Sequence, residues 1–196
     1  MTPLVSVITP TWQRHDFLLD RCIPSVQAQD YPHVEHLVVS DGPDPELEAA
    51  ISSRFPDIRY DELPDREGAG HWGHRGRLRA LEMAKGDLIT YLDDDDAYRP
   101  NHCRVLAAAL EANPAAGFAY SLMSNGGTVI GTDPPAYCQI GTPMIMHRRG
   151  LTDWAGTWER SMPSIDWDLV ERWLQAGASY VHVPVITSDV WPSAYR

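Results

Sequence analysis

Residues 87–96, DLITYLDDDD, are the stretch that decides the fold. The apolar part, residues 88–92, has the length and composition of a buried strand. Four aspartates follow it without a break. Because like charges at contact distance raise one another's pKa or recruit a cation, the run predicts a site for a hard divalent cation, Mg²⁺ or Mn²⁺. The alternative interpretation is a solvated acidic turn that begins the next helix.

Strands and helices alternate along the rest of the chain. Short apolar or β-branched runs predict strands at residues 4–9, 35–40, 58–61, 87–92, 118–123, 128–130 and 180–186. Helical spacing predicts helices at residues 16–29, 45–54, 78–85, 100–111 and 166–175. Pro24 is expected to kink the first helix and Gly86 to stop the third, while the glycine-rich residues 68–76 are expected to form a loop.

This alternation predicts an α/β fold with a mostly parallel central sheet and helices on both faces. Ligands of such sheets bind beyond the carboxyl ends of the strands. Asp41 and the four aspartates at residues 93–96 both follow predicted strands directly. The sequence therefore places a candidate site at this edge of the sheet.

Length, charge and cysteine content narrow the class of protein. At 196 residues and 43% hydrophobic, the chain is long enough for one domain with a core, and its apolar runs have strand length and predict no membrane span. A net charge of −11 argues against a nucleic-acid binder, so an anionic ligand needs a cation or placed arginines. The three cysteines form no C-x-x-C pair, which predicts a reducing, cytoplasmic setting without disulfides or zinc.

Four segments, taken in order, resemble family 2 glycosyltransferases, which use the GT-A fold. They are VSVITPTWQR at 5–14, VVSDG at 38–42, AKGDLITYLDDDD at 84–96 and SIDWDLVERWLQAG at 164–177. The resemblance implies a single Rossmann-like GT-A domain over residues 1–196, with a nucleotide-binding half of about 1–96 and an acceptor-side half of about 97–196. It also implies metal-assisted, inverting transfer of a sugar from a nucleotide-sugar donor, a UDP-sugar by family habit, to an acceptor hydroxyl.

The resemblance also assigns residues to a donor site. The nucleotide pocket is implied to contain Pro10, Thr11, Arg14, Asp41, Arg77, Asp93 and Asp94. Asp41 is implied to accept a hydrogen bond from the base, and Asp93 to contact the ribose. Asp95, the second acid of the D-x-D motif, is implied to bind the Mn²⁺ or Mg²⁺ that holds the diphosphate, with Asp96 behind it.

Asp166 is implied to be the general base, because it begins the segment that resembles the family's catalytic helix. The competing interpretation is that Asp166 only caps that helix, and Asp168 is the second choice for the base. Two positions depart from the family pattern. Ile165 stands where the family usually has another acid, and Leu78 stands where it has the asparagine of an alanine-arginine-asparagine triplet.

Two other functions compete with glycosyl transfer. A nucleotidyltransferase shares the α/β nucleotide-binding half, but its glycine-rich activation loop is absent from residues 9–14. A non-catalytic nucleotide-sugar-binding protein is supported by Ile165 and Leu78.

Several other residues have both a functional and a packing interpretation. For His71 and His74 a substrate lid is favoured over a metal site. Trp72 has two interpretations, stacking on a base or sugar and packing on the body of the protein. For the late tryptophans, Trp154 and Trp158 favour sugar stacking, whereas Trp167 and Trp173 favour the core. The segment 141–147 lies where the family has its acceptor-side strand, and core packing is the default for Met144 and His147.

Overall fold

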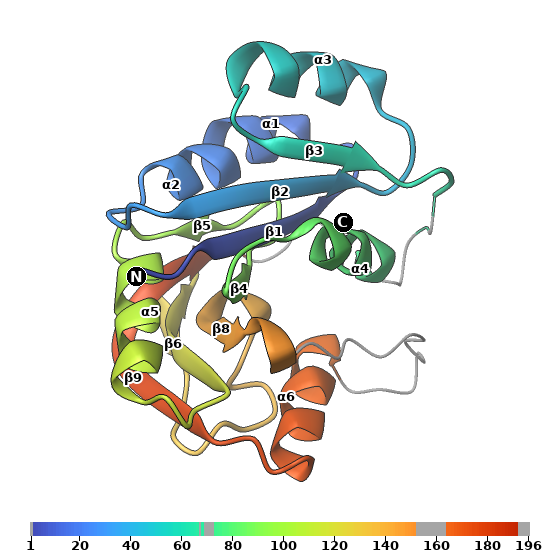
Figure 1. Cartoon of the computed structure of the whole chain (residues 1–196). Coiled ribbons are helices and arrows are strands. Elements are labelled where there is room, and N and C mark those ends of the chain that lie inside the picture. The colour runs from blue at the N-terminus through green and yellow to red at the C-terminus, as the bar shows by residue number, and fades with distance from the viewer. Residues whose placement is uncertain (1, 67, 69–72, 152–163, 192–196) are drawn as a thin grey trace.

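The computed structural model describes residues 2–66, 68, 73–151 and 164–191 (Figure 1). Within these residues one sheet has the order β3-β2-β1-β4-β8-β6-β9-β5, with β7 paired to β6. Its parallel half consists of β1 (Val5–Thr11), β2 (Val34–Ser40), β3 (Arg59–Glu62) and β4 (Leu88–Tyr91). The remaining strands are β5 (Ala97–Tyr98), β6 (Phe118–Asn125), β7 (Thr128–Ile130), β8 (Ile145–Arg148) and β9 (Tyr180–Val190). Strand β8 is antiparallel to both β4 and β6 and so joins the two halves of the sheet.

Helices cover both faces of this sheet, which confirms the predicted α/β architecture (Figure 1). One hydrophobic cluster holds side chains of α2 (Ile23–Gln27), α3 (Pro45–Arg54) and α5 (His102–Ala112). The other holds side chains of α4 (His74–Met83) and α6 (Ile165–Gln175). No helix in the described part of the chain is both long and apolar enough to cross a membrane.

Strand β1 lies at the centre of the parallel half and is buried along its whole length. Its neighbours are β2 on one side, where Thr11 pairs with Ser40, and β4 on the other, where Ile8 pairs with Tyr91. The carboxyl ends of three adjacent parallel strands therefore meet. This register brings the turn after β1, the Asp41 that follows β2 and the acidic run after β4 to one edge of the sheet.

The segment predicted as one helix over residues 16–29 is divided in the structure. It comprises α1 (His15–Phe17), a π-helical turn (Leu18–Cys22) and α2, with Pro24 in the first turn of α2. A proline fits the first turn of a helix because the N–H that it lacks has no partner within the helix there. The predicted interruption is thus confirmed: a π-helical turn, which is wider than an α-helical one, lies between α1 and α2.

Two local predictions around α4 are wrong. Residues 74–76, expected in a loop, form the first turn of α4, because Gly73 adopts a left-handed conformation (φ 71°) at the N-cap. Gly86 does not stop the helix, which ends at Met83 with Ala84 as its C-cap. A Cβ at Gly86 would lie 2.6 Å from the backbone nitrogen of Ser6, so Gly86 serves a close backbone approach instead.

Two 3₁₀ turns, η2 (Thr142–Met144) and η3 (Arg149–Leu151), flank β8. Strand β8 itself lies in the segment that the family resemblance assigned to an acceptor-side strand. The two-residue strand β5, by contrast, carries no pattern of its own and forms only because it pairs with β9.

Candidate functional site

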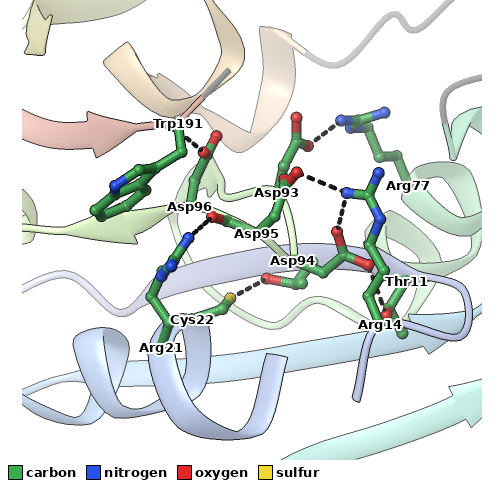
Figure 2. A network of polar contacts seen from close by, with 11 residues as sticks. Thr11, Arg14, Arg21, Cys22, Arg77, Asp93, Asp94, Asp95, Asp96 and Trp191 are labelled. Atoms are coloured by element: carbon green, nitrogen blue, oxygen red, sulfur yellow. Dashed lines mark hydrogen bonds and ion pairs between the residues drawn. The ribbon is translucent and has the colours of Figure 1, made fainter. Parts of the chain in front are cut away.

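The acidic run forms a tight turn at the end of β4 (Figure 2). The backbone N–H of Asp96 donates to the carbonyl oxygen of Asp93 over 3.1 Å. Asp94, Asp95 and Asp96 are buried, with exposed fractions of 5%, 8% and 4%. Three adjacent carboxylates are thus removed from water, and each needs a cation, a donor or a proton.

Arg14, from the turn after β1, supplies positive charge to two of these carboxylates. Its Nη1 atom lies 3.0 Å from Oδ1 of Asp94 and 2.8 Å from Oδ2 of Asp95. The Thr11 hydroxyl donates to the other oxygen of Asp94 over 2.8 Å. The end of β1 and the end of β4 are therefore tied together by the residues that the sequence places in the nucleotide pocket.

Asp93 differs from its three neighbours because its side chain is 40% exposed. It pairs with Nη2 of Arg77, whose side chain is only 3% exposed and comes from α4. Helix α4 reaches this position because it packs closely on Pro10, where a Cβ at Gly73 would lie 2.7 Å from the Pro10 Cβ. The buried arginine thus holds an accessible carboxylate at the edge of the site.

The electrostatics of the turn favour an added cation. Desolvation raises the pKa of Asp94 to about 6 and that of Asp96 to about 9, and Asp93 and Asp95 add repulsion at Asp96. The pKa of Asp95 is also raised, first by desolvation, although Arg14 lowers it. A divalent cation at this turn would reverse these shifts by stabilising the ionised forms.

The residues present fit Mg²⁺ or Mn²⁺, because every donor at the turn is an oxygen. Across the described residues, no three His, Cys, Asp or Glu side chains converge as a preformed metal cage. Mg²⁺ sites in nucleotide-binding proteins commonly take one or two carboxylates and complete the shell with substrate phosphates and water. Asp95 and the diphosphate of a donor would make such a set.

Asp41 lies across β1 from the acidic turn. Its backbone N–H donates to the Thr11 carbonyl oxygen over 2.9 Å, and its Oδ2 atom accepts from the Gly68 N–H over 3.1 Å. Beside it, the Arg66 guanidinium lies 4.7 Å from the centre of the Trp12 ring. This contact between Trp12 and Arg66 was not predicted from the sequence, because it joins side chains 54 positions apart.

Helix α6 brings Asp166 to the same site. The pKa of Asp166 is raised to about 6, first by desolvation and then by the nearby Asp93, while Arg77 and a hydrogen bond from the Thr142 backbone oppose the shift. Residues 24 to 89 positions earlier in the chain thus influence one carboxyl group. Ser164 is the N-cap of α6 and Asp166 lies in its first turn, so the capping interpretation does not describe Asp166.

Asp168, the second choice for the base, is bound within its own helix. Its Oδ2 atom accepts from Nε of Arg172 over 3.0 Å. Asp168 is thus engaged by a residue of its own helix, whereas Asp166 interacts with Asp93 and Arg77 of the site. The geometry therefore favours Asp166 over Asp168.

The other candidates divide between the core, the surface and segments outside the described residues. Met144, His147 and Trp173 are buried in the core. Beside Arg77 on α4, Arg75 and Arg79 form exposed ion pairs with Asp65 and Asp61. His74 is buried at the start of α4. His71, Trp72, Trp154 and Trp158 lie outside the described residues.

Comparison with known proteins finds glycosyltransferases among the relatives of this chain. TuaG of Bacillus subtilis (strain 168), a glycosyltransferase named for teichuronic acid biosynthesis, is 33% identical over 137 residues, which cover 64% of this chain and 50% of TuaG. This chain thus spans about half the length of the curated relatives it matches.

Solved structures share the fold. TarS of S. aureus in complex with UDP superposes with a TM-score of 0.74 at 18% identity, covering 97% of this chain and 61% of TarS. The mannosyltransferase PcManGT of Pyrobaculum calidifontis, in complex with GDP-Man and Mn²⁺, gives a TM-score of 0.70 at 17% identity, covering 100% of this chain and 58% of PcManGT.

The profile described as glycosyl transferase family 2 matches residues 6–151, well over half of the chain. With the GT-A fold, the acidic turn after β4 and the Asp41 position after β2 in place, this match assigns the family. The chain belongs to glycosyl transferase family 2.

Proposed function

We propose that this chain transfers a sugar from a nucleoside-diphosphate donor, a UDP-sugar, to an acceptor hydroxyl with inversion at the anomeric carbon. The observation that carries the proposal is the electrostatic interaction of Asp166 with Asp93 and Arg77, which are themselves an ion pair. A carboxyl group with a pKa of about 6 is within electrostatic reach of Asp93 in the acidic turn, which supports a proton acceptor close to the proposed diphosphate site. In this proposal the donor is bound by about residues 1–96, and the acceptor approaches from about residues 97–196.

The donor nucleotide is held along the ends of the parallel strands. Asp41 accepts a hydrogen bond from the base, and the backbone of Pro10 and Thr11 lines the pocket beside it. Asp93, oriented by Arg77, contacts the ribose. Both oxygens of Asp94 already accept from Thr11 and Arg14, so Asp94 shapes the pocket by fixing those two residues.

Asp95 would hold Mg²⁺ or Mn²⁺ together with the diphosphate of the donor. When bound, Mg²⁺ or Mn²⁺ supplies Lewis-acid stabilisation of the leaving nucleoside diphosphate. Asp166 accepts the proton of the acceptor hydroxyl while the acceptor oxygen bonds to the anomeric carbon and the diphosphate departs. Alignment of acceptor and donor in one site contributes further to the rate.

Base recognition gives a direct test of this donor assignment. Asp41→Ala is expected to weaken UDP binding in Mn²⁺ by about 1 to 3 kcal/mol, because a charged acceptor of a ring N–H is lost. Isothermal titration calorimetry measures the effect. Asp30→Ala is the matched control, since it removes a carboxylate that is 42% exposed and paired with Arg104. Equal dissociation constants for the Asp41→Ala and Asp30→Ala variants would place the base elsewhere.

A further inference from the structure

The end of β9 is fastened to the acidic turn by residues that the proposed chemistry does not use. Nη1 of Arg21 donates to the backbone carbonyl oxygen of Asp95 over 2.8 Å. The same guanidinium lies 4.0 Å from the centre of the Trp191 ring. The backbone N–H of Trp191 in turn donates to Oδ1 of Asp96 over 3.3 Å. Figure 2 shows Trp191 and Arg21 on the side of the turn opposite Arg14 and Arg77.

Both strands that flank the turn are held in place. Before it, β4 is paired within the sheet; after it, β5 pairs with β9, with Ala97 opposite Asp189. Arg99 strengthens this second attachment, because its Nε and Nη2 atoms lie 3.0 and 2.8 Å from the two carboxylate oxygens of Asp189. A bidentate pair of this kind adds geometric definition as well as energy. The position of the acidic turn therefore depends on β9, from the acceptor-side half.

Arg21 is suited to fix the backbone of Asp95. It projects from the π-helical turn Leu18–Cys22, and its guanidinium also lies 5.1 Å from the centre of the Phe17 ring. A planar guanidinium stacked on aromatic rings keeps its N–H groups in one orientation, which a flexible ammonium does not. The carbonyl of Asp95 thus has a preoriented donor, and its peptide plane sets the direction in which the Asp95 side chain leaves the backbone.

We propose that Arg21 and Trp191 are positioning residues that hold the backbone of Asp95 so that its carboxylate meets the metal and the donor diphosphate. The inference rests on the proposed role of Asp95 as the metal ligand. Partners that orient a metal ligand typically contribute about 10- to 100-fold to metal affinity. Arg21 and Trp191 touch neither donor nor acceptor in this account and act only through Asp95.

The test is Mn²⁺ affinity, measured by calorimetry in saturating UDP for the wild type and four variants. Trp191→Ala and Arg21→Met are expected to weaken Mn²⁺ binding by about 10- to 100-fold. Trp191→Phe keeps an aromatic face for Arg21 and is expected to restore most of that loss. Arg54→Met is the matched control, because Arg54 lies 5.1 Å from the Phe55 ring centre and donates to the Leu19 carbonyl, but on the surface.

Melting temperatures measured in EDTA separate an effect on positioning from an effect on folding. If the role is positioning, Trp191→Ala and Arg21→Met bind Mn²⁺ more weakly, although their melting temperatures without metal stay close to that of Arg54→Met. If Trp191→Ala does not fold, Arg21→Met gives the same comparison. Wild-type affinity in Trp191→Ala or Arg21→Met overturns the positioning role, as does a Trp191→Phe variant that is as weak as Trp191→Ala. A wild-type protein that binds no Mn²⁺ overturns the metal assignment itself and the inference with it.

Discussion

Asp166→Asn is expected to lower kcat by about 10²- to 10⁴-fold, the range for loss of a positioned general base. Asparagine has nearly the same shape as aspartate but does not accept the proton of an acceptor hydroxyl. The fold should be retained, because Ser164, and not Asp166, is the N-cap of α6. Donor binding should also be retained, since Asp166 touches the acceptor in this account. Product formation from a UDP-sugar, measured beside UDP affinity, separates the two effects.

Asp168→Asn is the matched control for this variant. Asp168 lies in the same turn of α6 but is paired with Arg172, so its replacement should cost far less activity. The wild-type pH profile adds a second criterion. Because the base must be ionised and burial raises the pKa of Asp166 to about 6, kcat should rise with pH through this region and then level off. An active Asp166→Asn variant beside an inactive Asp168→Asn variant would move the base to Asp168.

Asp95→Asn is expected to remove the metal dependence of nucleotide binding. Partners of a metal ligand contribute about 10- to 100-fold to metal affinity, so loss of the ligand itself should reach at least the upper end of that range. Titration of UDP in Mn²⁺ and in EDTA should then give the same weak affinity for this variant. Asp20→Asn, which neutralises a side chain that is 67% exposed, controls for the change in net charge. A variant that keeps the wild-type response to Mn²⁺ would assign the metal to another residue.

The parallel half of the fold was predictable because its signals are local. The run at residues 87–96 combines a strand and its functional end, and helix α3 occupies the predicted residues 45–54 because Asp44 caps it and Pro45 begins it. Parallel pairing then places Asp41 and the acidic turn on the same edge without further information.

What the sequence could not show depends on contacts between distant residues. The sequence alone gives no measure of the raised pKa of Asp166, which arises from burial and from Asp93, 73 positions earlier. Gly86 looked like a helix stop, and only the approach of the Ser6 backbone explains it. Strand β5 and the contacts of Trp191 with Arg21 and Asp96 likewise exist only after β9 has paired with β5.

The central claim is that this site binds a nucleoside diphosphate together with a divalent cation. Thermal melting of the wild type with UDP, GDP, CDP or ADP, each in Mn²⁺ and in EDTA, tests it most directly. At a concentration one hundred times its dissociation constant, a ligand that binds only the native state adds about 2.7 kcal/mol to the free energy of unfolding. For a chain of this size, that raises Tm by roughly 5 to 10 °C. We predict this rise for UDP with Mn²⁺ and a much smaller one in EDTA. Melting temperatures that none of the diphosphates changes, with or without Mn²⁺, would contradict the account.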